Sequence, residues 1–144
     1  MGGINKPGFY DFALLHKLGE QRIANDSKNA IVSRAKDGSL VVAVWNLVPL
    51  DAQPSAKRVS LHFTGVAPNA GVSLERVDET HGNAIPAYKA MGSPASPTAK
   101  QVEELNRASA LPAPEKGNLQ NGGLELELGA NALMLVTVQS SARP

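Results

Sequence analysis

The densest group of side chains that could do chemistry lies in the eight-residue segment RVDETHGN, from Arg76 to Asn83. Asp78, Glu79, His81 and Asn83 bring two carboxylates, an imidazole and an amide close together in the sequence. Groups of these types act as acid and base in glycosidases, as metal ligands, or as acceptors that hold the backbone of a tight turn. The spacing of the residues and the rest of the chain decide among these three.

Spacing argues against catalysis and metal binding. Two carboxylates that hydrolyse a glycoside stand roughly 5–10 Å apart across the sugar, whereas Asp78 and Glu79 are neighbours and point to opposite faces of an extended segment. A metal site needs three or four convergent ligands, and no other acidic or histidine cluster lies nearby in the sequence. A Ser-His-Asp triad lacks a G-x-S-x-G elbow, and His16, His62 and His81 occur in unrelated patterns. We therefore assign no catalytic residue and no metal ligand.

The third interpretation is a structured loop. Asp78, Thr80 and Asn83 can accept hydrogen bonds from nearby backbone N–H groups, and Gly82 suits a position with positive φ. The loop is longer than a simple hairpin needs, and we expect it to be ordered.

The elements around this loop are mostly strands. Alternating or continuous apolar runs predict strands at 30–35, 39–47, 57–64, 72–77, 124–129 and 132–138. Because turns rich in Gly, Pro and Asn separate these runs, we expect a mainly β chain that folds as an antiparallel β-sandwich.

An N-terminal helix is predicted over residues 6–18. Pro7 suits its first turn, Gly19 suits the position just past its end, and His16 and Lys17 favour its last carbonyl groups. Its apolar residues cover more than one stripe, so we expect this helix to have neighbours on two sides.

One short helix is predicted between the later strands. Thr98 and Gln101 have the spacing of a capping box, and Val102 and Leu105 form a narrow apolar stripe after it. The stretch 112–123 is a loop by composition.

Composition limits the partners. The chain has 144 residues, 42% hydrophobic and 19% charged, which is typical of a globular protein. Its 14 basic and 13 acidic residues form no long run of either sign, which argues against nucleic acid and against an anionic membrane surface. No run approaches the ~20 apolar residues of a membrane span. Cysteine is absent, and the N-terminus lacks signal-peptide features, so the chain as written would stay in the cytoplasm.

A longer pattern gives a family resemblance. Residues 76–111 are similar to a segment of glycoside hydrolase family 39, the β-xylosidases and α-L-iduronidases, that reads Arg-x-Asp, Asn, an aromatic, Met-Gly-x-Pro, x-Pro-Thr, Gln and Leu. The matching residues are Arg76, Asp78, Asn83, Tyr88, Met91, Gly92, Pro94, Pro97, Thr98, Gln101 and Leu105. Tyr88 replaces the usual tryptophan. Residues 3–19 resemble the last helix of the family's catalytic barrel, and the likeness covers roughly residues 3–138.

The resemblance implies a non-catalytic role. Residues 1–19 would be a remnant of the final barrel helix, and residues 20–144 a β-sandwich accessory domain. The family's two catalytic glutamates lie on a (β/α)₈ barrel, and no glutamate here has a matching context, so we expect no enzyme activity from this chain alone and no cofactor. The expected partner is such a barrel, in cis or in trans, in an enzyme that degrades xylan or xylo-oligosaccharides.

The resemblance also predicts where this loop lies in the parent enzyme. Asp78, His81, Asn83 and Tyr88 are expected on a loop that borders the active site of the parent enzyme. A secretion signal in the parent would precede the barrel, so the intact enzyme could be secreted or periplasmic. The compact motif favours β-xylosidase over α-L-iduronidase ancestry.

Two other functions stay open. A free-standing carbohydrate-binding module would bind xylo-oligosaccharides through an exposed aromatic side chain. Tyr88 is the candidate, because Trp45 lies among valines and is expected in the core. Alternatively, an uncovered barrel-facing surface would make the chain a homo-oligomer.

Overall fold

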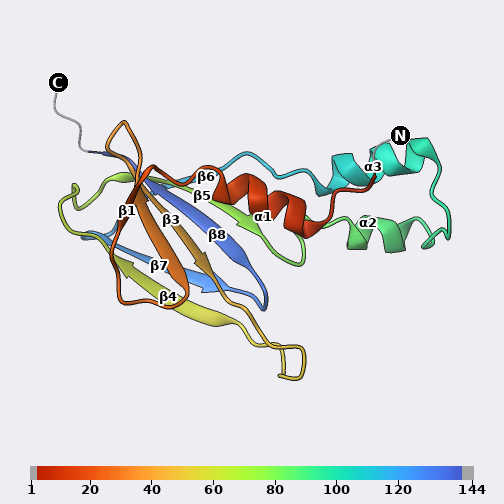
Figure 1. The fold of residues 1–144 in the computed structure, drawn as a ribbon, viewed down its shortest axis with the longest axis horizontal. Helices are drawn as coiled ribbons and strands as arrows, with labels where there is room; N and C mark the ends of the chain where they lie inside the picture. The colour runs from red at the N-terminus through yellow and green to blue at the C-terminus, as the bar shows by residue number, and fades with distance from the viewer. Residues whose placement is uncertain (1–2, 141–144) are drawn as a thin grey trace.

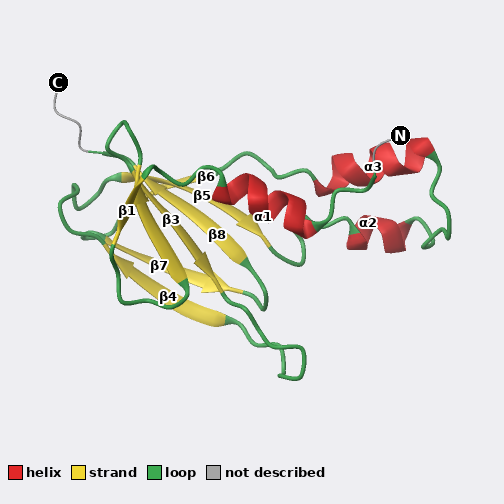
Figure 2. Cartoon of the chain, viewed as in Figure 1, coloured by secondary structure: helices red, strands yellow, loops and turns green. Residues whose placement is uncertain are grey.

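The structure is a computed structural model that describes residues 3–140. In chain order the elements are α1 (Pro7–Leu15), β1 (Gln21–Ile23), β2 (Ala30–Arg34), β3 (Leu40–Trp45), β4 (Lys57–His62), β5 (Gly71–Val77), α2 (Ile85–Ala90), α3 (Ala99–Ser109), β6 (Glu115–Asn118), β7 (Gly123–Leu128) and β8 (Leu133–Val138). Strands dominate one end of the molecule, and α2 and α3 project from the other as a helical arm (Figures 1 and 2).

Two antiparallel sheets of unequal size form the sandwich. The larger has six strands in the order β1-β2-β3-β8-β5-β6, and the smaller consists of β4 and β7. Strand β8, which is last in the chain, pairs with both β3 and β5 and so lies at the centre of the large sheet. The small sheet packs on one face of the large sheet and α1 on the other (Figure 1). The prediction of a mainly β antiparallel sandwich is confirmed.

The central strands are buried on both faces, which explains their continuous apolar sequences. Even-numbered residues of β3 and β8 point toward the small sheet, and odd-numbered residues point toward α1. The core between the sheets is built on Leu40, Val42, Val44, Val72, Leu119, Leu126, Leu128, Met134, Val136 and Val138. The core under the helix is built on Tyr10, Leu14, Val41, Ala43, Val77, Leu133 and Leu135.

Helix α1 has the two apolar sides that the sequence predicts. Tyr10 and Leu14 are buried against the large sheet, whereas the side chains of Phe9 and Phe12 are 56% and 70% exposed. The helix ends at Leu15, earlier than predicted, and the chain continues in tight turns to residue 18.

The predicted role of Lys17 at the helix carbonyl groups is wrong. The Lys17 Nζ atom instead lies 2.6 Å from Glu75 Oε1 on β5. This ion pair joins the end of the helix to the sheet, because the turns after Leu15 carry the lysine toward the neighbouring strand.

Three elements differ from the sequence-based expectation. The stretch 112–123, predicted as a loop, contains β6, which pairs with β5 at the edge of the large sheet. Strand β6 has the sequence EKGN and is exposed along its length, so it shows no apolar alternation. The short elements β1 and α2 were not predicted either, and α2 has no buried residue.

The predicted capping box of α3 is confirmed. The Gln101 N–H donates to Thr98 Oγ1 at 3.2 Å, and the Thr98 N–H donates to Gln101 Oε1 at 2.9 Å. Leu105 is fully buried and Val102 half-buried, as the apolar stripe indicated.

Candidate functional site

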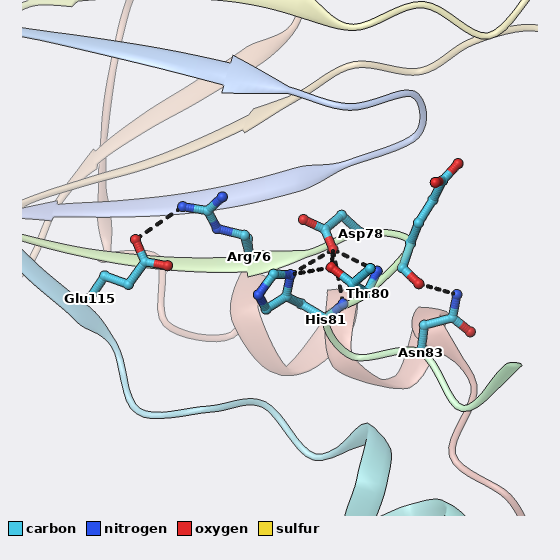
Figure 3. A network of polar contacts seen from close by, with 7 residues as sticks. Arg76, Asp78, Thr80, His81, Asn83 and Glu115 are labelled. Carbon is cyan, nitrogen blue, oxygen red and sulfur yellow. Dashed lines mark hydrogen bonds and ion pairs between the residues drawn. The ribbon is translucent and has the colours of Figure 1, made fainter. Parts of the chain in front are cut away.

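The Asp78–His81 turn begins directly after β5 ends at Val77. Asp78 Oδ1 accepts hydrogen bonds from the backbone N–H groups of Thr80 and His81, each at 2.9 Å, and lies 2.7 Å from His81 Nδ1 (Figure 3). The Asp78 N–H donates to the His81 carbonyl at 2.9 Å, and Gly82 follows with a φ of 67°. The loop is therefore the hydrogen-bonded turn that the residue types predicted.

The charge state of Asp78 fits a structural role. Partial burial alone would raise the pKa of Asp78, but the hydrogen bonds from His81 and Thr80, together with the positive charge of His81, hold this pKa below its ordinary value. A general acid at neutral pH needs the opposite shift. The carboxylate is thus stabilised in its charged form as an acceptor for the turn.

Asn83 and Tyr88 continue the loop into α2. The Asn83 Nδ2 group donates to the Glu79 carbonyl at 3.1 Å, and Asn83 Oδ1 accepts from the Ile85 N–H at 3.0 Å. The Tyr88 hydroxyl donates to the Pro94 carbonyl at 2.8 Å. The ring of Tyr88 is half-buried and lines an open apolar hollow beside residues 4–7.

The four predicted loop residues do not form one cluster. Asp78 and His81 contact each other, whereas Asn83 and Tyr88 lie beside the N-terminal segment. Asp78 also lines a second hollow, together with Glu79 and Thr80 and with residues 54–56 and 129–130. Three loops thus meet at this end of the sandwich.

Contacts that the sequence did not reveal anchor the arm. The Tyr10 hydroxyl and Ser109 Oγ lie 2.8 Å apart and are buried. Asn106 of α3 accepts from the Asn5 N–H at 2.7 Å and donates to the Gly3 carbonyl at 3.1 Å. These contacts join α3 to α1 and to the N-terminal segment, so the helical arm is held against both.

Trp45 is less buried than predicted. It packs against the core under α1, but its side chain is only partly buried and lines a hollow beside that helix. Most of the lining is apolar, and Asp11 contributes a carboxylate. Burial raises the pKa of Asp11 above its ordinary value.

Within residues 3–140, no three acidic or histidine side chains are placed to share a metal ion. In the same range, no helix has the length and apolar character to cross a bilayer.

The fold and the loop define a class of protein: an antiparallel β-sandwich with one helix packed on its large sheet and a helical arm carried by a hydrogen-bonded loop. Residues 1–122 match the glycosyl hydrolases family 39. The chain belongs to this family, as the pattern from Arg76 to Leu105 indicated.

The relatives are longer than the region of similarity. The chain is 30% identical over 138 residues to a β-xylosidase of Geobacillus stearothermophilus, covering 94% of this chain and 27% of that enzyme. It is 32% identical over 118 residues to a β-xylosidase of Caldicellulosiruptor saccharolyticus, covering 76% of this chain and 23% of that enzyme. The chain thus spans about a quarter of the length of these relatives.

A solved structure confirms the fold. The crystal structure of a monomeric β-xylosidase from Caulobacter crescentus CB15 superposes with a TM-score of 0.76 at 17% identity. The superposition covers 95% of this chain and 31% of that enzyme.

Proposed function

We propose that this chain serves as the non-catalytic accessory β-sandwich of a β-xylosidase-like glycoside hydrolase. Residues 1–19 complete the last helix of the catalytic barrel, and residues 20–144 form the accessory domain that packs on that barrel. One observation carries the proposal: Phe12 of α1 is 70% exposed although the opposite side of the helix is tightly packed. A helix with two apolar sides needs a second neighbour.

We further propose that the loop from Asp78 to Tyr88 shapes the rim of the parent active site without reacting. Its polar side chains are engaged in the turn, and the pKa of Asp78 is shifted away from that of a general acid. This supports a positioning role. The catalytic glutamates and the xyloside substrate then belong to the barrel.

A domain exchange tests this function. Residues 3–140 would replace the corresponding segment of the Geobacillus stearothermophilus β-xylosidase, and the exchanged enzyme would be compared with one lacking the segment. We expect xylobiose hydrolysis and a single unfolding transition from the exchanged enzyme only. An exchanged enzyme that is no more active or stable than the deletion would refute the accessory role.

The loop has its own test in the same enzyme. Replacing residues 79–88 by a short Gly-Ser linker should raise KM for xylobiose or lower the unfolding temperature. Unchanged values of both would refute the rim proposal.

A carbohydrate-binding module is the second candidate, favoured by the position of the Tyr88 ring at an open hollow. Titration of the isolated chain with xylobiose, followed by ¹H–¹⁵N correlation spectra, distinguishes the two. Shifts confined to residues 78–88 would support sugar binding, and a spectrum that does not respond would exclude it.

A further inference from the structure

An apolar strip runs along the outer side of α1. Phe9, Phe12 and Leu15 follow one another at three-residue spacing, which places each beside the next on one side of a helix. Phe9 and Phe12 are mostly exposed, and Leu15 is half-buried. Phe9 and Phe12 take no part in the core that Tyr10 and Leu14 enter, whereas Leu15 at the end of the strip also packs against that core.

The strip ends in an apolar socket, an open hollow of about 340 Å³. Leu15, Ile31, Trp45, Leu47 and Leu133 supply its apolar lining, and Leu47 at its rim is 77% exposed. Sites that hold sugars orient them with several placed polar groups. This socket is lined mainly by hydrocarbon and suits an apolar side chain better.

Asp11 adds a charge at the edge of the socket. It precedes Phe12 on α1 and lines the hollow with Leu15. Within residues 3–140, no hydrogen bond or ion pair engages its carboxylate, and partial burial raises its pKa. A carboxylate that loses water without gaining a partner is destabilised, and a cation at the same edge would reverse this.

We propose that the strip and the socket dock an apolar side chain of the catalytic barrel, and that a lysine or arginine beside that side chain pairs with Asp11. This rests on the proposed accessory function and names the chemistry of the surface that the barrel presents. Two observations favour the barrel as the occupant. In the β-xylosidase relatives about three quarters of the chain lies outside the matched region, so a large partner is available.

Charge is the second observation. Two copies of this chain related by a twofold axis would present the same patch to each other. None of the residues that line the socket is a lysine or arginine. A second copy would therefore bring another carboxylate rather than the cation that Asp11 lacks.

Paired measurements in two proteins test the docking surface. Phe12→Ser and Asp11→Asn would each be made in the isolated chain and in the exchanged β-xylosidase described above. Leu50→Ser is the matched control for Phe12, since Leu50 is fully exposed and lies outside the socket lining. Asp51→Asn is the matched control for Asp11, since Asp51 is exposed and lies outside the socket lining.

The expected result is a difference between the two proteins. Phe12→Ser should lower the unfolding temperature of the exchanged enzyme by at least about 2 °C while leaving the isolated chain nearly unchanged. Asp11→Asn should lower the unfolding temperature of the exchanged enzyme at about 20 mM salt. The decrease should be smaller at about 500 mM salt, because salt screens an ion pair at an interface edge. Leu50→Ser and Asp51→Asn should each change the unfolding temperature by the same amount in the isolated chain and in the exchanged enzyme.

The outcomes separate the two proposals. If the exchanged enzyme is inactive or unfolds in two transitions, the accessory function fails and the docking surface with it. If it is active and unfolds once, but Phe12→Ser and Asp11→Asn shift it no more than the isolated chain, only the docking surface is refuted. Dimerisation of the isolated chain that Phe12→Ser abolishes, with the exchanged enzyme unaffected, would assign the surface to a second copy and also overturn the inference.

Discussion

Replacing Asp78 by alanine removes the acceptor on which the turn after β5 is built. Two backbone N–H groups and the His81 ring lose their shared partner, Oδ1. The partly buried bond from the His81 N–H contributes about 1 kcal/mol and the exposed bond from the Thr80 N–H about 0.5 kcal/mol. The hydrogen bond between Oδ1 and the His81 ring adds about 0.5 kcal/mol, because both side chains retain contact with water. We expect Asp78→Ala to lower the free energy of unfolding by about 2 kcal/mol at neutral pH.

Urea unfolding followed by the fluorescence of Trp45 measures this loss, since Trp45 is the one tryptophan of the sequence and is half-buried. Asp78→Asn keeps an oxygen for the backbone N–H groups but removes the charge, so its loss should be about 1 kcal/mol. Asp51→Ala, at an exposed aspartate, is the control and should stay within about 0.5 kcal/mol of the parent chain. A loss from Asp78→Ala no larger than this control would refute the reasoning.

The pH dependence supplies a second check on the same residue. The folded state holds the pKa of Asp78 below its ordinary value of 3.8. The stabilisation is therefore fully present above pH 3.8 and is lost as the pH falls through the lower folded pKa. The difference between the parent chain and Asp78→Asn should shrink below that pH. A constant difference down to acid unfolding would contradict the assigned charge state.

Three other substitutions test the scaffold. Leu14→Ala empties a fully buried position between α1 and the large sheet and should cost about 3 kcal/mol in the urea assay; a loss below about 1 kcal/mol would contradict that packing. Gly19→Ala places a Cβ onto the Arg34 carbonyl, so the unfolding temperature should fall, and an unchanged value would contradict the close approach. Thr98→Ala removes the cap of α3 and should cost about 1 kcal/mol, whereas Thr98→Ser should retain most of it; equal losses from the two would refute the capping role.

The candidate loop could be interpreted from sequence because its interactions are local. Asp78 bonds to groups two and three residues away, and the side chain of Asn83 reaches the carbonyl group four residues before it. Residue type and spacing are enough to predict such contacts. The anchoring of the arm was not predictable in this way, because Tyr10 and Ser109 stand 99 residues apart.

The main strands, the N-terminal helix and the capping box at Thr98 could be predicted from residue pattern alone. Apolar periodicity and turn residues encode these elements within a few positions. The family could also be identified from the residues between Arg76 and Leu105, and the match over residues 1–122 confirms it.

The pairing of the strands and the contacts of each face of α1 follow only from the folded chain. Strand β6 forms by backbone pairing with β5, although its own side chains are exposed. The centre of the large sheet is set by β8, whose residues pair with partners between 56 (Val77 with Leu133) and 98 (Leu40 with Val138) positions away in the sequence. Pairing and burial are shared between distant segments, so no single segment carries the information in its own pattern.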